Sequence, residues 1–260
     1  MSMIEYTVDG AVAVIRLDRP PVNALSDEFA AEILEAVQRA ADPAIRAVVM
    51  YGTPHFAAGA DIKGFGQAHA DHTAGQDVDV DPASTLVEAI RTMELLPKPI
   101  IAAITGYALG GGLELAMGAD FRFAGEGAKV GQPEILLGII PGAGGTQRLT
   151  RLVGLQKSRE LNYSGRHVPA DEARELGIVD AVFPDDEVLE AAVAKAKEYA
   201  AGPTLAIGAA KRAIAEGYGR PVAEGMEIER EAFRSIFFSD DAKEGVAAFV
   251  EKRRADFSGS

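Results

Sequence analysis

The chain has 260 residues, of which 48% are hydrophobic and 25% are charged, and its formal net charge at pH 7 is −13. A chain of this length can bury a large core, and no apolar run approaches the roughly 18 residues that a membrane span needs. The acidic balance argues against non-specific nucleic-acid binding, which depends on neutralising phosphates with lysine and arginine, and the absence of cysteine excludes disulfides and thiol catalysis.

The amino-terminal half alternates between predicted strands and helices. Alternating residues on either side of Asp9-Gly10 are typical of a β-hairpin, and Ser26, followed by two acidic residues, is a predicted N-cap. Short apolar runs predict buried strands. The elements expected in chain order are a hairpin of residues 4–8 and 11–17, a helix from 26 to about 41, a strand at 47–50, a helix around 86–93 and a strand at 99–104.

The carboxy-terminal half changes character at Gly202-Pro203. Strands still alternate with helices before this point, whereas only helical patterns remain beyond it. This order predicts an α/β core, residues 1–200, followed by a helical region, residues 201–260. The elements expected are strands at 121–123 and 178–183, a turn at 132–134, and helices at about 145–153, 156–163, 187–200, 204–216, 222–237 and 241–254.

Three consecutive glycines, Gly110 to Gly112, follow an apolar run and lead into a predicted helix. They leave bare backbone N–H groups at a helix N-terminus, where the helix dipole favours negative charge. Glu114 stands two residues beyond them, and Glu134 precedes a second glycine-rich turn at 141–145. Exposed amides beside two carboxylates indicate acid/base chemistry next to a polarised carbonyl group.

Each of these features also has a purely structural interpretation. A triple glycine allows a tight turn with close helix–strand packing, and an acidic residue such as Glu114 is favoured in a first helical turn. Acidic residues such as Glu134 are common in turns. The small-residue loop at 57–61 either supplies a second amide donor for an oxyanion or simply connects two elements. It is the combination that favours an active site.

Other catalytic and binding motifs are weak or missing. The run Gly142-Ala-Gly-Gly-Thr-Gln147 lacks the third glycine of a dinucleotide fingerprint, and the chain has neither a P-loop Gly-Lys-Ser/Thr nor a Gly-x-Ser-x-Gly sequence. The Gly-, His- and Asp-rich segment 64–82 contains His69 and His72, and its pattern favours a mobile surface loop over a metal site. We therefore expect no bound metal.

Several stretches, taken in their order along the chain, resemble the enoyl-CoA hydratase/isomerase (crotonase) family. The resemblance spans nearly the whole chain, and several motifs in one order are far more specific than any one of them. It implies a crotonase (ClpP-like) spiral of ββα turns with a C-terminal helical trimerisation region. The matching stretches are Arg19–Leu25, Phe56–Lys63, Ile104–Leu115, Gly131–Gly138, Pro141–Arg148 and Phe249–Arg253.

The resemblance implies catalytic roles for four residues. The backbone N–H groups of Ala60 and Gly111 would form an oxyanion hole for the thioester oxygen. Glu114 would activate a water molecule, and Glu134 would protonate the α-carbon. Two glutamates that share one water titrate as a pair, so this division of roles belongs to the pair rather than to either residue alone.

The resemblance also implies what the protein binds. Coenzyme A enters as part of an acyl-CoA substrate, held by Ala58, Ala60, Asp61 and Ile62, with Lys252 reaching the CoA phosphate of a neighbouring subunit. No further cofactor, nucleic acid or membrane is implied, and the assembly would be a homo-trimer or homo-hexamer. Because the first residues show no basic segment followed by an apolar stretch, we expect no secretory signal and a cytoplasmic protein.

The implied activity is syn addition of water to a trans-2-enoyl-CoA, giving a 3-hydroxyacyl-CoA as in fatty-acid β-oxidation. An alternative on the same scaffold is Δ3,Δ2-enoyl-CoA isomerisation, although family isomerases commonly lose the first carboxylate, here Glu114. A catalytically silent acyl-CoA-binding protein would carry the same motifs. One branch of the family binds RNA through a lysine-rich helix, but the corresponding helix here, 26–42, contains no lysine.

Overall fold

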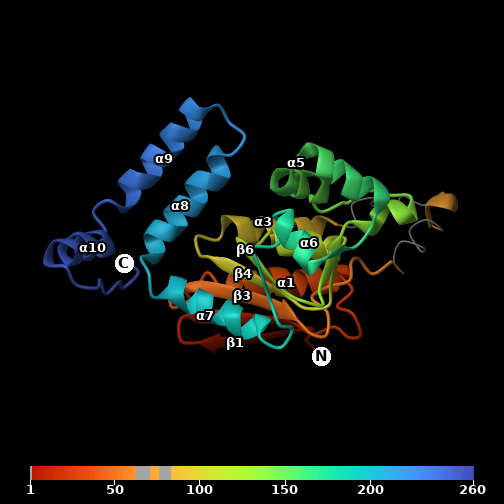
Figure 1. Ribbon diagram of the computed structural model, residues 1–260, viewed down its shortest axis with the longest axis horizontal. Coiled ribbons are helices and arrows are strands. Elements are labelled where there is room, and N and C mark those ends of the chain that lie inside the picture. The colour runs from red at the N-terminus through yellow and green to blue at the C-terminus, as the bar shows by residue number, and fades with distance from the viewer. Residues whose placement is uncertain (1, 63–70, 76–82) are drawn as a thin grey trace.

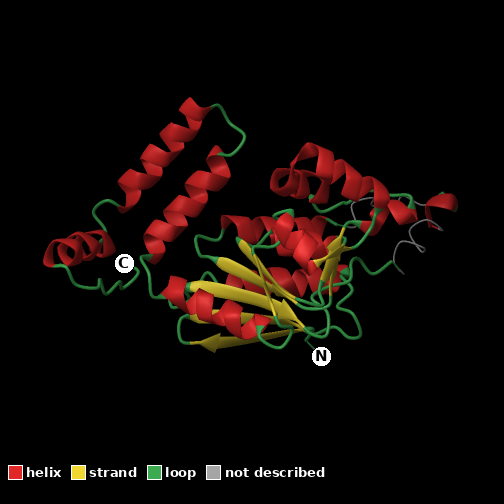
Figure 2. Ribbon diagram, in the orientation of Figure 1, coloured by secondary structure: helices red, strands yellow, loops and turns green. Residues whose placement is uncertain are grey.

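Six strands form the larger sheet in the described part of this computed structural model, which comprises residues 2–62, 71–75 and 83–260 (Figures 1 and 2). The strand order is β1-β2-β3-β4-β6-β9; β1 is antiparallel to β2, and the later neighbours are parallel. The predicted hairpin and buried strands are confirmed, whereas most of the loop predicted at 64–82, including His69, lies outside the described residues. The strands are β1 Ile4–Asp9, β2 Val12–Leu17, β3 Ala47–Gly52, β4 Ile100–Ile104, β6 Phe121–Gly125 and β9 Ala181–Phe183.

Helices cover both faces of this sheet, which is why its central strands are almost continuously apolar. Alternate residues of β2 point to opposite faces: Ala13 and Ile15 pack in the cluster that includes residues of α1 (Asp27–Arg39) and α3 (Ser84–Leu95). Val12 packs instead in a second cluster with α7 (Val188–Ala200). The α1 helix begins as predicted, because the Ser26 hydroxyl accepts a hydrogen bond from the N–H of Phe29 at 3.3 Å.

A second, smaller sheet lies beside the first and was not predicted. It consists of β5 (Tyr107–Leu109), β7 (Lys129–Gly131) and β8 (Val168–Pro169), each too short to give a hydrophobic period. The chain passes from β4 into β5 through Gly106, whose φ of 57° lies in the left-handed region that favours glycine. The turn predicted at 132–134 is the start of a 3₁₀ helix, η1 (Pro133–Leu137).

Three further helices follow the strands of the smaller sheet along the chain. The longest, α5 (Gly145–Ser164), bends at Gly154, whose φ of 76° is not helical, so the two helices predicted here meet at that residue. The helices α4 (Gly111–Met117) and α6 (Ala170–Glu175) are short. α4 directly follows β5 and carries the triple glycine into the interior, so β5, β7 and α4 together position the candidate site.

The carboxy-terminal helices extend away from the sheets (Figure 1). They are α8 (Thr204–Gly217), α9 (Val222–Ile236) and α10 (Asp240–Glu251), close to the predicted bounds. Large apolar side chains on them face solvent, and Phe249 is 86% exposed. An α/β core followed by a helical region is therefore confirmed as the fold class, and the helical region leaves apolar surface uncovered within one chain.

One arginine ties this helical region to the core. Arg46, which precedes β3, donates through Nε to the hydroxyl of Thr204 at 2.7 Å and through Nη2 to the carbonyl of Gly202 at 2.7 Å. Its Nη1 donates to the carbonyl of Phe257 at 3.0 Å. Charge-assisted hydrogen bonds from the residue before β3 thus attach both the start and the end of the helical region to the core.

Candidate active site

The triple glycine allows α4 to approach the loop that follows β3. The N–H of Gly110 donates to the carbonyl of Gly131 at 2.9 Å, and Gly110 has φ 51° and ψ −126°, a conformation open to glycine. A Cβ atom on Gly112 would overlap the carbonyl oxygen of Ala57. Two of the three glycines are therefore required by backbone geometry, which brings the start of α4 against residues 57–60.

Two backbone amides become available at this contact. Leu25 and Ala60 form an isolated parallel bridge, in which Leu25 N–H donates to Gly59 and Asp61 N–H donates to Leu25, both at 2.8 Å. The N–H of Ala60 therefore points to the other side of its segment, toward α4. Gly111 is the first residue of α4 and has no acceptor within the helix. Within the described residues, neither amide donates to a backbone carbonyl.

The two amides lie next to each other. A Cβ atom built on Gly111 would be 3.9 Å from the nitrogen of Ala60, and it would also contact the side-chain ends of Leu86 and Leu25 at 3.2 and 3.3 Å. The amide pair is thus bordered by apolar side chains, where a hydrogen bond to a developing negative charge is stronger than in water. The structure therefore brings together the two residues that were predicted to form an oxyanion hole.

Glu114 is buried one turn into α4, with only 2% of its surface exposed. Its Oε1 accepts hydrogen bonds from the N–H of Ala143 at 2.8 Å and the N–H of Gly145 at 2.6 Å, both from the second glycine-rich turn. Burial raises the pKa of Glu114, and the two amides and the charge of Arg148 oppose that rise. The result is a fixed carboxylate with one oxygen engaged by amides and enhanced affinity for a proton.

Glu134 lies on η1 and faces the triple glycine. A Cβ atom on Gly110 would be 3.0 Å from its Oε1, so glycine leaves room for the carboxylate. Burial raises the pKa of Glu134 to about 7, with a further contribution from the nearby charge of Glu114. Gln132 is fully buried beside it, and with its side-chain amide turned so that the nitrogen faces the carboxylate, it donates to Oε1 at 2.9 Å and to Oε2 at 3.2 Å. A carboxyl group with such a pKa is suited to exchanging protons near neutral pH.

A cavity of about 520 Å³ joins these groups. Glu114, Glu134, Ala60 and Gly111 all line it, together with largely apolar neighbours from α1, α3 and the segment after η1. A cavity of this size, mostly apolar with a few convergent polar groups, is typical of a small-molecule binding site. The apolar lining includes Leu25, Ala30, Ile62, Leu86, Leu136, Leu137, Ile139 and Ile140.

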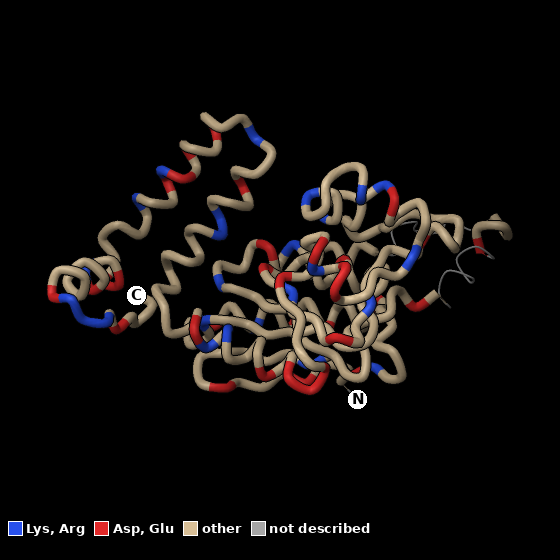
Figure 3. Tube along the Cα trace, viewed as in Figure 1, with Lys and Arg blue, Asp and Glu red and all other residues tan. Residues whose placement is uncertain are grey.

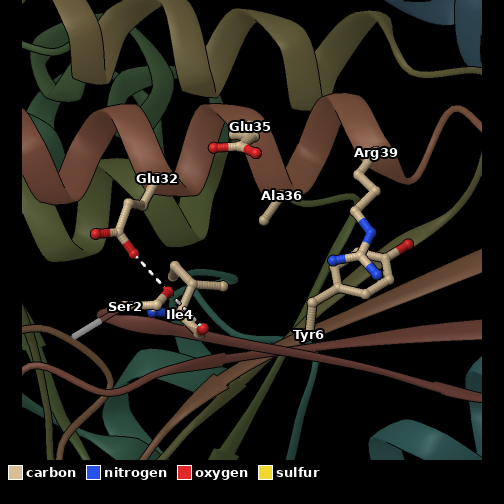
Figure 4. A pocket seen from close by; sticks show the side chains of 7 residues that line it. All are labelled: Ser2, Ile4, Tyr6, Glu32, Glu35, Ala36 and Arg39. Atoms are coloured by element: carbon tan, nitrogen blue, oxygen red, sulfur yellow. Dashed lines mark hydrogen bonds between the residues drawn. The ribbon is translucent and has the colours of Figure 1, made fainter.

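A second, shallower hollow of about 140 Å³ lies between β1 and α1 (Figure 4). Two pairs of its lining residues interact with each other: Glu32 accepts from the hydroxyl of Ser2 at 2.8 Å, and the guanidinium of Arg39 stacks over Tyr6 at 4.1 Å from the ring centroid. None of the predicted site residues lines it. It is a surface feature without the chemistry of the larger cavity.

The predicted substrate-binding residues do not all lie at the cavity. Ala58 and Ile62 line the cavity, whereas the carboxylate of Asp61 forms an ion pair with Arg19 at 2.6 Å, which braces the loop. Lys252 is different: it ends α10 with φ 56°, and Figure 1 shows α10 on the other side of the molecule from α5. Within one chain, Lys252 is therefore not brought to the cavity.

Some residues around the site were not predicted. Gln132, Ala143 and Gly145 contact the two carboxylates, and Arg148 supports the turn that contains Ala143. In the sequence, a loop amide, small loop residues and an arginine do not by themselves indicate a catalytic site.

Within the described ranges no cluster of three or more potential metal ligands occurs, and no helix there is long and apolar enough to cross a membrane.

Comparison with known proteins agrees with this geometry. The family described as enoyl-CoA hydratase/isomerase matches residues 7–260. A probable enoyl-CoA hydratase of Rhizobium meliloti is 44% identical over 95% of both chains, and the mitochondrial enoyl-CoA hydratase of Pongo abelii is 40% identical over 96% of this chain and 84% of its own. The crystal structure of an enoyl-CoA hydratase from Bacillus anthracis superposes with a TM-score of 0.91 at 35% identity, covering 99% of this chain and all of that one.

Proposed function

The chain belongs to the enoyl-CoA hydratase/isomerase family and has its fold, and on this premise we propose that it adds water to trans-2-enoyl-CoA thioesters, giving 3-hydroxyacyl-CoA by syn addition. The single observation that carries the proposal is that Glu114 and Glu134 line one cavity beside the two backbone amides of Ala60 and Gly111. An apolar cavity with one oxyanion site and two carboxylates of raised pKa has what hydration of a conjugated thioester requires.

The reaction begins with polarisation of the thioester. Its carbonyl oxygen accepts hydrogen bonds from the N–H groups of Ala60 and Gly111, which draws electron density from the conjugated double bond and makes the β-carbon electrophilic. Water attacks that carbon as the Glu114 carboxylate takes one of its protons, and the enolate formed is stabilised by the two amides. Glu134 then gives a proton to the α-carbon, so the elements of one water molecule are added and no other group is consumed.

The active enzyme carries one proton on the glutamate pair. Hydration starts with this proton on Glu134 and ends with a proton on Glu114, and exchange with water restores the starting state. The two environments favour this distribution. Burial raises the pKa of both glutamates. At Glu114 the N–H groups of Ala143 and Gly145 and the charge of Arg148 oppose the rise, whereas at Glu134 the charge of Glu114 adds to it.

Glu134→Gln is expected to stabilise the folded protein at pH 8. Because the pKa of Glu134 rises from 4.5 to about 7 on folding, the folded state resists ionisation, and the free energy of unfolding falls as pH rises from about 4.5 through about 7. A neutral glutamine removes that cost, for a gain of about 1–2 kcal/mol at pH 8 once partial solvent screening is allowed for, and little gain at pH 4.5. Urea denaturation at both pH values measures the difference; an equal change at the two would contradict the assignment.

We further propose that the CoA portion of the substrate lies along residues 58–62. Ala58 and Ile62 open onto the cavity, and the small side chains there allow close approach of a ligand to the backbone. The ion pair between Asp61 and Arg19 helps to hold this loop in place. Lys252 would serve the CoA phosphate of a neighbouring subunit, since α10 lies far from its own cavity (Figure 1).

We also propose that the chain assembles as a homo-trimer, or as a homo-hexamer built from two trimers, because its helical region leaves apolar side chains exposed. The helical region 201–260 exposes Met226, Phe233, Phe237 and Phe249, each more than half exposed, which is more apolar surface than a soluble chain usually leaves uncovered. The core, 1–200, would hold the site, and the helical region would pack against other copies. Lysine and arginine are interspersed with aspartate and glutamate in the part of the chain drawn in Figure 3, an arrangement that supports an enzyme of small molecules over an RNA-binding role.

The proposal is tested with two substrates. Crotonyl-CoA mixed with the purified protein should lose the absorbance of its conjugated enoyl thioester, whereas a 3-enoyl-CoA should gain it slowly or not at all. Rapid gain with the 3-enoyl-CoA and no loss with crotonyl-CoA would identify an isomerase. Tight CoA binding without turnover of either substrate would identify a silent binding protein.

A further inference from the structure

Arg148, on the first turns of α5, holds the glycine-rich turn that supports Glu114. Its Nη1 donates to the carbonyl of Ala143 at 2.7 Å, and its Nε and Nη2 donate to the two carboxylate oxygens of Glu94 at 2.7 and 2.9 Å. Glu94 lies on α3, near the end of that helix. The planar guanidinium is thus fixed by a bidentate pair on one side and directed at a single backbone carbonyl on the other.

The same turn supplies both amides that bind Glu114. Ala143 N–H and Gly145 N–H donate to Oε1 of Glu114, while the Ala143 carbonyl accepts from Arg148. Gly144, between them, has φ 101°, and a Cβ atom there would overlap Nη1 of Arg148. The arginine therefore occupies the space that a side chain at 144 would need, and it fixes the turn from the side opposite the carboxylate.

We propose that Arg148, oriented by Glu94, is a positioning residue for hydration: through the turn 143–145 it holds the Glu114 carboxylate in the orientation that takes a proton from water. The inference rests on the proposed function, and it concerns residues that act through Glu114 without contacting the substrate. Residues that orient metal ligands through hydrogen bonds typically cost about 10–100-fold in affinity or activity when removed, and we expect a loss of similar size here.

Stability alone does not account for this arrangement. The side chains of Arg148 and Glu94 are 21% and 39% exposed, and an ion pair at that exposure contributes only about 0–1 kcal/mol to folding. The hydrogen bond to Ala143 acts instead on a buried turn, where a small displacement moves two amides away from Glu114. A misplacement of about 1 Å in a catalytic group can cost on the order of 10²-fold in rate.

The charge of Arg148 acts in the same direction as its hydrogen bond. The charged groups around Glu114 are Arg148 from α5, Glu134 from η1 and, behind the arginine, Glu94 from α3. Burial raises the pKa of Glu114, and the positive charge of Arg148 lowers it. Removing the arginine should therefore favour protonated Glu114, which cannot take a proton from water, whereas removing the negative charge of Glu94 should have the opposite effect on this pKa.

The test compares Arg148→Met, Arg148→Lys and Glu94→Gln with Arg151→Met, an exposed arginine one turn further along α5. With crotonyl-CoA, we expect Arg148→Met to lower kcat about 10–100-fold with KM within about twofold, and to move the acidic limb of the pH profile to higher pH. Arg148→Lys keeps the charge, so its acidic limb should stay near the parental position while kcat falls less. Glu94→Gln should move the limb to lower pH, and Arg151→Met should change nothing.

The Glu114 carboxyl can also be titrated directly, without turnover. In protein labelled with ¹³C-glutamate, its signal is identified by its absence from Glu114→Gln, and its pKa should rise in Arg148→Met and fall in Glu94→Gln. Unchanged pKa values and unchanged kcat in both variants would overturn the positioning role. A parent enzyme that does not hydrate crotonyl-CoA would instead overturn the proposed function, while the direct titration would still decide whether Arg148 acts on Glu114.

Discussion

Glu114→Gln is expected to lower the rate of hydration about 10³-fold, because general base catalysis by a positioned side chain contributes about 10²–10⁴-fold. Glutamine keeps the size of the side chain, and its carbonyl oxygen can still accept from the N–H groups of Ala143 and Gly145, which hold Oε1 at 2.8 and 2.6 Å. The fold and the cavity should therefore remain. What is lost is the carboxylate that takes the proton of the attacking water.

Glu134→Gln should have an effect of similar size on the same reaction. Stopped-flow loss of enoyl-thioester absorbance measures both variants, and CoA-ester binding by calorimetry should stay within a few-fold of the parent. Glu126→Gln, at an exposed position in the turn between β6 and β7, is the matched control and should retain parental turnover. Near-normal hydration by Glu114→Gln would exclude Glu114 as the base that takes a proton from the attacking water.

Gly111→Pro is also expected to have a large effect, because it removes one backbone N–H at a position where the backbone can accept proline. Proline is accepted at the first position of a helix, where its missing N–H has no helical partner. The residue before proline must be extended, and Gly110 has φ 51° and ψ −126°, the mirror image of an extended conformation, which glycine adopts freely. Loss of one oxyanion donor should reduce kcat about 10²–10³-fold.

Gly111→Ala separates the loss of the amide from the added bulk. A Cβ atom there contacts Leu86 and Leu25 at 3.2 and 3.3 Å, and both contacts are to the ends of flexible side chains that can move by a few tenths of an ångström. Because the N–H remains, alanine should keep kcat within about tenfold of the parent, whereas proline should not. If the two substitutions reduced kcat equally with crotonyl-CoA, steric crowding rather than the oxyanion contact would be the cause.

Local signals along the chain were sufficient for most of the fold. The hairpin followed from alternation around Asp9-Gly10, the start of α1 from the Ser26 cap, and the buried strands β3 and β4 from short apolar runs. Each of these elements is determined by residues close together in sequence. The smaller sheet was missed because β5, β7 and β8 have three residues or fewer, so their pairing depends on neighbours that are distant along the chain.

Part of the candidate site could be predicted, because its residue types and its glycine pattern are visible in the sequence. Glu114, Glu134 and the glycines that expose the amide of Gly111 could be recognised from residue types and the family resemblance, and the structure brings them to one cavity with Ala60. Gln132 and Arg148 could not, because an amide in a turn and an arginine on a helix have many possible partners. Only the fold shows that Gln132 reaches Glu134 and that Arg148 reaches the turn that binds Glu114.

Glu114 and Glu134 are proposed to act from the same side of the enoyl group, Glu114 on the attacking water and Glu134 on the α-carbon. Hydration of crotonyl-CoA in D₂O, followed by NMR of the isolated 3-hydroxybutyryl product, tests this proposal most directly. We expect one deuterium at the α-carbon, on the same face as the oxygen added to the β-carbon, in a single diastereomer. A mixture of diastereomers, or deuterium on the opposite face, would contradict a mechanism in which Glu114 and Glu134 act from the same side of the substrate.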